Sequence, residues 1–251
     1  MRTDSPDRTA GPDPLSLLAR SGQARNAPMS AQHADWLLSQ LGASTASRVL
    51  DLGCGWGEML LRSLREARGA TGFGVDTEEQ HLRRARQSAV TRGLSERVTF
   101  SREDPAQCPR TADRVLCIGT SPRWGGTLEA LTALQRNVEA GGRLLFGAGF
   151  WAQPPTPEAV DTLGRQSESL PELVDSAVGA GWRPLYVDTA SLAEWDNFEF
   201  ASNRELELLA LTDPGNPLAE PARTRADDRR TDYLRAYRGV LGYAYLVLAK
   251  Q

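Results

Sequence analysis

The fold is decided by the stretch VLDLGCGWGE, residues 49–58. Its apolar first half is typical of a buried β-strand, and its three glycines allow a sharp turn and a close approach of the backbone to a ligand. We expect a helix to begin at Glu58, and the amino terminus of a helix favours anionic groups. Because a glycine loop alone is a weak signal, its ligand has to be identified from residues elsewhere in the chain.

Strands and helices alternate on both sides of this loop. A helix is expected over residues 30–42, with Ser30 as its N-cap, and another runs through Val138 until Gly141 and Gly142 stop it. This alternation predicts an α/β, Rossmann-like parallel sheet covered by helices on both faces. The strands are expected at 48–52, 71–75, 97–100, 114–118, 143–146, 183–187 and 243–248, and the other helices at 58–67, 78–92 and 170–180.

The amino-terminal residues and one late segment depart from this pattern. Residues 1–14 are rich in Pro, Asp, Thr and Arg, which is typical of disorder. Residues from about 189 to 239 are rich in charges and aromatics, with a break at DPGNP, residues 213–217. We expect this segment to be a helical lid inserted between the last two strands.

Composition excludes several classes of protein. The 251 residues carry a formal net charge of -3 without a long basic run, so we expect no nucleic-acid partner. Three cysteines without CxxC spacing and only two histidines predict no metal site. No apolar run approaches a membrane span, and no secretory signal is visible, so we expect no membrane partner and a cytoplasmic protein, monomeric or homodimeric.

Acidic residues follow the first three strands in turn. Asp51 precedes the loop, where it suits an ammonium group better than a pyrophosphate. Asp76 ends the second strand, where a carboxylate accepts hydrogen bonds from ribose hydroxyls. Asp104 follows the third and would accept from an adenine amino group. Together, these residues suit a ligand made of adenosine and a zwitterionic tail. A dinucleotide oxidoreductase is disfavoured by Asp51 and by Glu58, which stands where G-x-G-x-x-G has its last glycine.

These features resemble the motifs of class I S-adenosylmethionine-dependent methyltransferases, over residues 30–250. The resemblance implies a seven-stranded sheet whose last strand is antiparallel, a methyltransferase domain at 30–251, and a disordered or lid-like segment at 1–29. It also implies S-adenosylmethionine as cofactor, with Asp76 at the ribose and Asp104 at the adenine. The expected cofactor-binding residues are Asp51, Gly53, Cys54, Gly55, Asp76, Thr77, Asp104 and Gly119.

Later motifs resemble a small, poorly characterised bacterial methyltransferase group. They supply aromatic residues for an apolar acceptor pocket, and Glu199 and Tyr237 as candidates for a general base. The group's pattern leads us to expect an acidic residue near Ala148, which is absent. His81 is expected on the surface, and His33 in a surface or capping role. The expected substrate-binding residues are Trp124, Trp151, Trp195, Phe198 and Tyr243.

The predicted function is methyl transfer to a small-molecule acceptor, with secondary metabolism as one setting. Two alternatives stay open at this point. The same cofactor could serve a cyclisation or rearrangement, and Ala148 is compatible with a cofactor-binding protein that is not catalytic. The acceptor atom is not fixed by any of these motifs.

Overall fold

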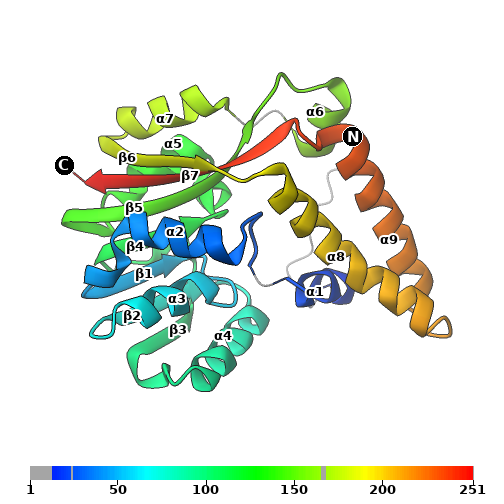
Figure 1. The fold of residues 1–251 in the computed structure, drawn as a ribbon, viewed down its shortest axis with the longest axis horizontal. Helices are drawn as coiled ribbons and strands as arrows, with labels where there is room; N and C mark the ends of the chain where they lie inside the picture. The colour runs from blue at the N-terminus through cyan, green and yellow to red at the C-terminus, as the bar shows by residue number, and fades with distance from the viewer. Residues whose placement is uncertain (1–12, 24, 165–167, 251) are drawn as a thin grey trace.

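The computed structural model describes residues 13–23, 25–164 and 168–250. The described residues form one seven-stranded sheet (Figure 1). Its strands are β1 (Arg48–Leu52), β2 (Thr71–Asp76), β3 (Val98–Arg102), β4 (Ala112–Ile118), β5 (Val138–Trp151), β6 (Trp182–Thr189) and β7 (Leu241–Lys250). The order is β3-β2-β1-β4-β5-β7-β6, and β7 runs antiparallel to both β5 and β6. The predicted α/β fold with an antiparallel last strand is therefore confirmed.

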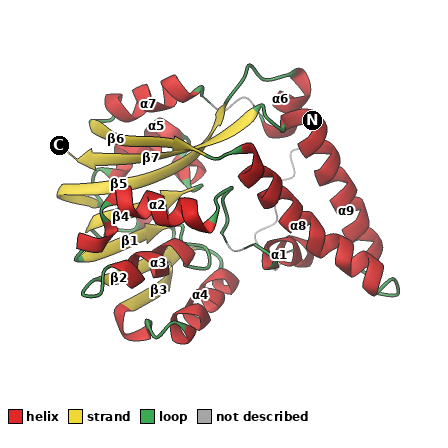
Figure 2. Cartoon of the chain, viewed as in Figure 1, coloured by secondary structure: helices red, strands yellow, loops and turns green. Residues whose placement is uncertain are grey.

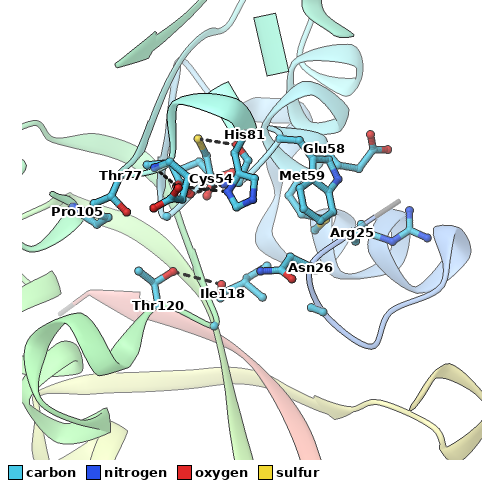
Figure 3. Close-up of a pocket in the computed structure, with 18 of the residues that line it drawn as sticks. Arg25, Asn26, Cys54, Glu58, Met59, Thr77, His81, Pro105, Ile118 and Thr120 are labelled. Carbon is cyan, nitrogen blue, oxygen red and sulfur yellow. Dashed lines mark hydrogen bonds and ion pairs between the residues drawn. The ribbon is translucent and has the colours of Figure 1, made fainter. Parts of the chain in front are cut away.

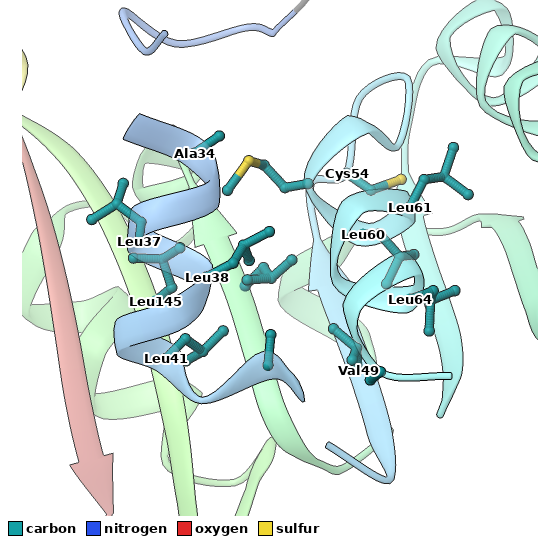
Figure 4. Packing of buried hydrophobic residues seen from close by; sticks show 14 of the residues in the cluster. Ala34, Leu37, Leu38, Leu41, Val49, Cys54, Leu60, Leu61, Leu64 and Leu145 are labelled. Carbon is teal, nitrogen blue, oxygen red and sulfur yellow. The ribbon is translucent and has the colours of Figure 1, made fainter. Parts of the chain in front are cut away.

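Helices cover both faces of this sheet. Successive residues of a strand point to opposite faces, so Val49 packs with α2, α3 and α4, whereas Leu50 packs with α5 and α7 (Figures 1 and 4). The helices are α1 (Pro14–Ser21), α2 (Ala31–Leu41), α3 (Glu58–Glu66), α4 (Glu79–Thr91), α5 (Thr127–Leu134), α6 (Pro157–Leu163), α7 (Leu170–Gly179), α8 (Leu192–Thr212) and α9 (Ala219–Asp232). Short helical turns are η1 (Ala43–Thr45), η2 (Ser95–Arg97), η3 (Pro105–Gln107), η4 (Ser121–Trp124) and the π-helical η5 (Tyr233–Tyr237).

The prediction of a helix through Val138 is wrong. Helix α5 ends at Leu134, and Val138 already pairs with Ala112 at the start of β5. Gly141 and Gly142 lie inside that strand, at φ +71° for Gly141, next to a shift in the β4–β5 register. A Cβ on Gly142 would lie 3.0 Å from the Asp113 carbonyl oxygen. The two glycines therefore mark an irregular close approach of two strands and do not stop a helix.

A helical insertion separates β6 from β7 in the chain. It consists of α8, α9 and η5, and it corresponds to the segment predicted at about 189–239. Helix α1 packs on α8 through a small apolar cluster, and these helices lie together beside the carboxyl ends of the central strands (Figure 2). Of the segment predicted to be disordered or lid-like, residues 1–12 lie outside the described part, while 14–21 form a helix. The buried residues of the apolar cluster between α1, α8 and α9 are Leu15, Ala19, Leu206, Ala222 and Ala226.

Candidate cofactor site

A cavity of about 370 Å³ lies at the carboxyl ends of the parallel strands (Figure 3). This is where open α/β sheets bind ligands, and the volume falls in the range of small-molecule sites. The walls come from the β1–α3 loop, the end of β2, the end of β4 and the segment between α1 and α2. The lining includes Arg25, Asn26, Met29, Asp51, Gly53, Cys54, Gly55, Trp56, Met59, Asp76, Thr77, His81, Pro105, Gly119 and Thr120.

The glycine loop is held against two neighbouring strands. The backbone nitrogens of Gly53 and Cys54 each donate a hydrogen bond of 2.9 Å to the carbonyl oxygen of Val75. Gly53 has a φ of +85°, and a Cβ there would lie 2.1 Å from Thr120 Oγ1. Only glycine fits both this backbone conformation and this contact, so the sequence signal at residues 53–57 has a direct structural cause.

Asp51 places a buried carboxylate in the cavity wall. The residue is 5% exposed, and its side chain has no hydrogen-bond partner among the described residues. Burial, together with repulsion from Asp76, raises the pKa of Asp51 to about 8. A buried carboxylate without a partner is costly, and an ammonium group of a ligand would remove that cost.

Asp76, by contrast, has several donors around its carboxylate. It accepts hydrogen bonds from the backbone nitrogens of Gly55 at 2.8 Å and Glu78 at 2.9 Å. The Nδ1 atom of His81 lies 3.5 Å from Asp76 Oδ1. Burial alone would raise the pKa of Asp76, but these donors lower it below its usual value. Asp76 is therefore ionised at neutral pH.

The prediction that His81 lies on the surface is wrong. The residue is only 9% exposed, lines the cavity and meets the Trp56 ring edge-to-face at 5.5 Å between centroids. Its position on α4 explains this, because His81, Ala85 and Ala89 follow one another at intervals of four and form the buried face of that helix. The same spacing is present in the sequence and indicates a buried position for His81, but the surface prediction did not take it into account.

Most of the predicted cofactor residues lie together. Of the eight, only Asp104 has no place in the described cavity lining; its side chain accepts a hydrogen bond from Ala106 N at 3.1 Å and caps η3, while the next residue, Pro105, lines the cavity. Adenine binding by Asp104 stays a prediction. Sequence reasoning missed Arg25, Asn26, Met29, Trp56, Met59, Thr120 and His81 as residues of this wall.

Three of the five predicted substrate residues form an aromatic cluster. The ring of Trp195 lies edge-to-face with those of Phe198, Tyr237 and Tyr243, at centroid distances of 6.0, 6.4 and 6.4 Å. The Tyr243 hydroxyl is 3.0 Å from where a Cβ on Gly119 would lie, so the cluster adjoins the cavity wall. We call these four rings the aromatic cluster.

The remaining two, Trp124 and Trp151, lie elsewhere. Trp124 packs against the core under α5 and α7, and Trp151 is paired with Leu241 at the end of β5. Neither belongs to the cavity lining or to a ring contact of the aromatic cluster in the described structure. Their substrate roles stay predictions.

Of the two candidate bases, Tyr237 belongs to the aromatic cluster and Glu199 lies next to Tyr237, and both are in the insertion. Glu199 is 7% exposed and forms an ion pair of 2.8 Å with Arg229. Burial and the neighbouring Glu199 carboxylate raise the pKa of Tyr237. Neither residue is part of the described lining of the cavity, so the structure does not bring them to the cofactor residues.

Of the surface or capping role expected for His33, the surface part is wrong, whereas its contact with Glu194, which caps α8, is consistent with a role at a helix start. Its side chain is 11% exposed, with Nδ1 3.0 Å from Glu194 Oε1 and Nε2 3.5 Å from Asp188 Oδ2. The N-cap prediction for Ser30 is confirmed, since its hydroxyl accepts a hydrogen bond from His33 N at 3.1 Å.

Within the described ranges no group of His, Cys, Asp or Glu is arranged to hold a metal ion. None of the helices in the same ranges combines the length and the apolar character that a membrane span requires.

Comparison with known proteins gives one consistent result. A family described as "Methyltransferase domain" matches residues 49–142. An uncharacterised Escherichia coli protein, YjhP, is 30% identical over 209 residues, which cover 80% of this chain and 84% of YjhP. A methyltransferase from Geobacter sulfurreducens, solved with S-adenosylhomocysteine, superposes with a TM-score of 0.86 at 26% identity, covering 94% of this chain and 98% of its own. A Thiobacillus denitrificans methyltransferase, also solved with S-adenosylhomocysteine, has a TM-score of 0.85 at 27% identity and coverages of 95% and 99%.

Proposed function

This chain belongs to the S-adenosylmethionine-dependent methyltransferases, and from that premise we propose that it transfers the methyl group to a small-molecule acceptor. When bound, S-adenosylmethionine supplies an electrophilic methyl group on a sulfonium centre. The protein then has to bind and orient the two reactants and exclude water.

The observation that carries the proposal is the unpartnered carboxylate of Asp51. It is buried, it lines the cavity and it adjoins the glycine turn at Gly53. The cofactor's methionyl tail carries an ammonium group, which is the natural partner for such a carboxylate. We assign Asp51 to this group, and Gly53, Cys54 and Gly55 to the border of the methionyl tail.

The other end of the cavity suits adenosine. Asp76 is ionised and lies beside Thr77, so we assign this pair to the ribose. Gly119 closes the wall at the end of β4. We keep Asp104 as the candidate for adenine binding, through the part of its carboxylate that does not cap η3.

The acceptor would approach from the aromatic cluster. Its rings come from α8, η5 and β7, and it adjoins Gly119 at the edge of the cavity. Aromatic walls exclude water and bind apolar or planar small molecules. The net charge of -3 disfavours a nucleic-acid acceptor. Where the acceptor must lose a proton, the candidate groups are Tyr237, which belongs to this cluster, and Glu199 beside it.

A transfer assay tests the proposal. The protein is incubated with S-adenosylmethionine labelled in its methyl group and with a bacterial extract divided by dialysis into small molecules and macromolecules. We expect label in the small-molecule fraction together with S-adenosylhomocysteine, and strongly reduced turnover in Asp51→Asn. Label only in macromolecules would contradict a small-molecule acceptor, and conversion of a metabolite without S-adenosylhomocysteine would contradict methyl transfer.

A further inference from the structure

We propose that the methyl acceptor is an apolar, planar molecule with a hydroxyl or carbonyl oxygen, and that Trp195 and Tyr243 donate hydrogen bonds to that oxygen. This inference rests on the proposed function and names the class of acceptor. The polar atoms of the aromatic cluster carry it, because the protein supplies some of them with a hydrogen-bond partner and leaves others without one.

Two of the four rings have a buried donor without a partner. Within the described part of the chain, Trp195 Nε1 and the Tyr243 hydroxyl are shielded from solvent and have no hydrogen-bond partner. Trp195 as a whole is 8% exposed. By contrast, Phe198 has no polar atom, and the Tyr237 hydroxyl is hydrogen-bonded to the Glu199 carboxylate. A buried donor without a partner is unfavourable, and an oxygen of a ligand would remove that cost at both rings.

The chemistry of the two donors defines the group that they hold. An indole N–H only donates, so Trp195 requires a ligand atom with a lone pair, which an ammonium or a methyl group does not have. Burial raises the pKa of Tyr243 above its usual value, so its hydroxyl keeps its proton and is a donor at neutral pH. Both donors are uncharged, and their surroundings are aromatic. A hydroxyl or carbonyl oxygen on an apolar ring fits these requirements.

The arginines beside the cluster do not add a free positive charge. Arg229 forms an ion pair of 2.8 Å with Glu199, and Arg238 Nε lies 2.8 Å from Asp196 Oδ1. Because each guanidinium already has its carboxylate, neither is free to hold an acidic group of the acceptor. The oxygen that Trp195 and Tyr243 hold is therefore assigned to a neutral group.

The two donors lie near the reacting end of the proposed cofactor site. The Tyr243 hydroxyl is 3.0 Å from where a Cβ on Gly119 would lie. The next residue, Thr120, contacts the glycine loop, since a Cβ on Gly53 would lie 2.1 Å from Thr120 Oγ1. Gly53 is assigned to the methionyl tail, which carries the sulfonium centre. Tyr243 therefore holds the acceptor oxygen on the side of the site from which the methyl group leaves.

A second cavity gives the acceptor its space. It has a volume of about 260 Å³ and lies between the segment before α2 and the first turns of α8. Arg25, Ala27 and Met29 line both this cavity and the cofactor cavity, and Phe198 of the aromatic cluster lines the second one. Neither donor belongs to the lining of these two cavities in the described structure, so the acceptor has to displace part of the cluster to reach them.

Titration of two matched probes tests this assignment. Phenol and toluene are added to the protein in complex with S-adenosylhomocysteine, and the indole N–H resonance of Trp195 is followed by NMR. Trp195→Phe identifies this resonance among those of the six tryptophans. We expect phenol to move it downfield, because a new hydrogen bond forms, and toluene not to do so. Tyr243→Phe should weaken phenol binding about tenfold and toluene binding less than twofold.

Tyr186→Phe is the matched control, because Tyr186 lies on β6 and its hydroxyl already has Trp36 and Asp188 as partners. It should bind both probes as the wild type does. A Trp195 resonance that phenol leaves in place, or equal losses of phenol and toluene affinity in Tyr243→Phe, would overturn the assignment. Failure of the wild type to bind S-adenosylhomocysteine would instead overturn the proposed function.

The natural acceptor provides a second measurement. The labelled small molecule from the transfer assay is identified by mass spectrometry, and its methylation is compared in the wild type and Tyr243→Phe. We expect an oxygen-containing planar compound, and a loss of about tenfold in kcat/KM with the affinity for S-adenosylhomocysteine unchanged. A labelled product without oxygen, or an unchanged kcat/KM, would contradict the role of the two donors.

Discussion

The carboxylate of Glu194 accepts a hydrogen bond of 2.7 Å from the backbone nitrogen of Ser30, 164 residues earlier in the chain. The same carboxylate accepts from Ser191 N at 2.9 Å and so caps α8, and it lies 3.0 Å from His33 Nδ1. Glu194 thereby connects the start of α2 to the start of the insertion. Burial alone would raise the pKa of Glu194, but hydrogen bonds from Ser30 and Ser191 lower it to about 2.

Replacing Glu194 should destabilise the protein at neutral pH and make its free energy of unfolding depend less on pH in the acid range. The folded pKa lies below the usual 4.5, so this stabilisation is complete above pH 4.5 and is lost as the pH falls toward 2. Glu194→Gln should lose about 1–3 kcal/mol at pH 7, as expected for a charged hydrogen-bonding group. Denaturant unfolding at several pH values measures both effects.

Glu220→Gln is the control for that experiment, because Glu220 is exposed at the start of α9. Its unfolding curves should follow those of the wild type at every pH. Equal acid sensitivity in Glu194→Gln and the wild type would show that this carboxylate does not hold the two segments together.

Cofactor affinity should depend on pH through Asp51. In the free protein the pKa of Asp51 is about 8, so the side chain is protonated at pH 7, whereas an ammonium group binds the ionised form. Binding should release a proton, and the affinity for S-adenosylhomocysteine should rise with pH, by at most tenfold per unit, and level off above about 8. Calorimetry in buffers of different ionisation enthalpy measures the released proton; an affinity independent of pH 6–8 would refute this role.

The same carboxylate should limit the stability of the free protein. The folded pKa of Asp51 is raised, so the folded state holds a proton that the unfolded state releases between pH 3.8 and about 8. The stability that protonated Asp51 gives the folded state is therefore lost as the pH rises through this window. Asp51→Asn should unfold at a less pH-dependent temperature and be more stable than the wild type at pH 8; a less stable variant there would contradict the burial argument.

Gly53→Ala should disrupt the loop far more than an alanine at an unconstrained glycine. The φ of +85° alone costs about 1–2 kcal/mol for a residue with a Cβ, and the contact with Thr120 adds to this. Gly69→Ala is the comparison, since a Cβ at Gly69 meets nothing within 4 Å. Thermal unfolding should separate the two variants clearly, and equal melting temperatures would show that the loop tolerates a side chain.

Glu199→Gln distinguishes a base from a structural ion pair. Since Glu199 is outside the described cavity wall, its replacement should leave the affinity for S-adenosylhomocysteine within twofold. As a general base it would contribute on the order of 10²–10⁴ to kcat. Wild-type turnover in Glu199→Gln, with only a lower melting temperature, would assign it to the Arg229 ion pair instead.

The sheet and the cofactor loop were predictable because their signals are local. Apolar runs in the sequence located the strands. Asp51 is the penultimate residue of β1 and Asp76 the last residue of β2, so both could be placed from the strand ends. The start of β5 was missed because pairing of Val138 with Ala112, distant in the chain, overrides the glycine signal at Gly141.

Residues that reach the cavity by tertiary packing were not predictable in the same way. Arg25, Asn26 and Met29 line it because α1 packs on α8 and α2 packs on the sheet, and neither contact has a motif. Asp104 was assigned from its order in the chain, whereas the local geometry of η3 uses its carboxylate as a cap. His81 is the exception, since its helical spacing was visible in the sequence.

Titration of S-adenosylhomocysteine into the wild type and Asp51→Asn at pH 8 tests the central claim most directly. We predict saturable binding to one site per chain in the wild type and at least tenfold weaker binding in Asp51→Asn, because the ammonium group loses its charged partner. Absence of saturable binding to the wild type, or equal affinity of the two proteins, would contradict it.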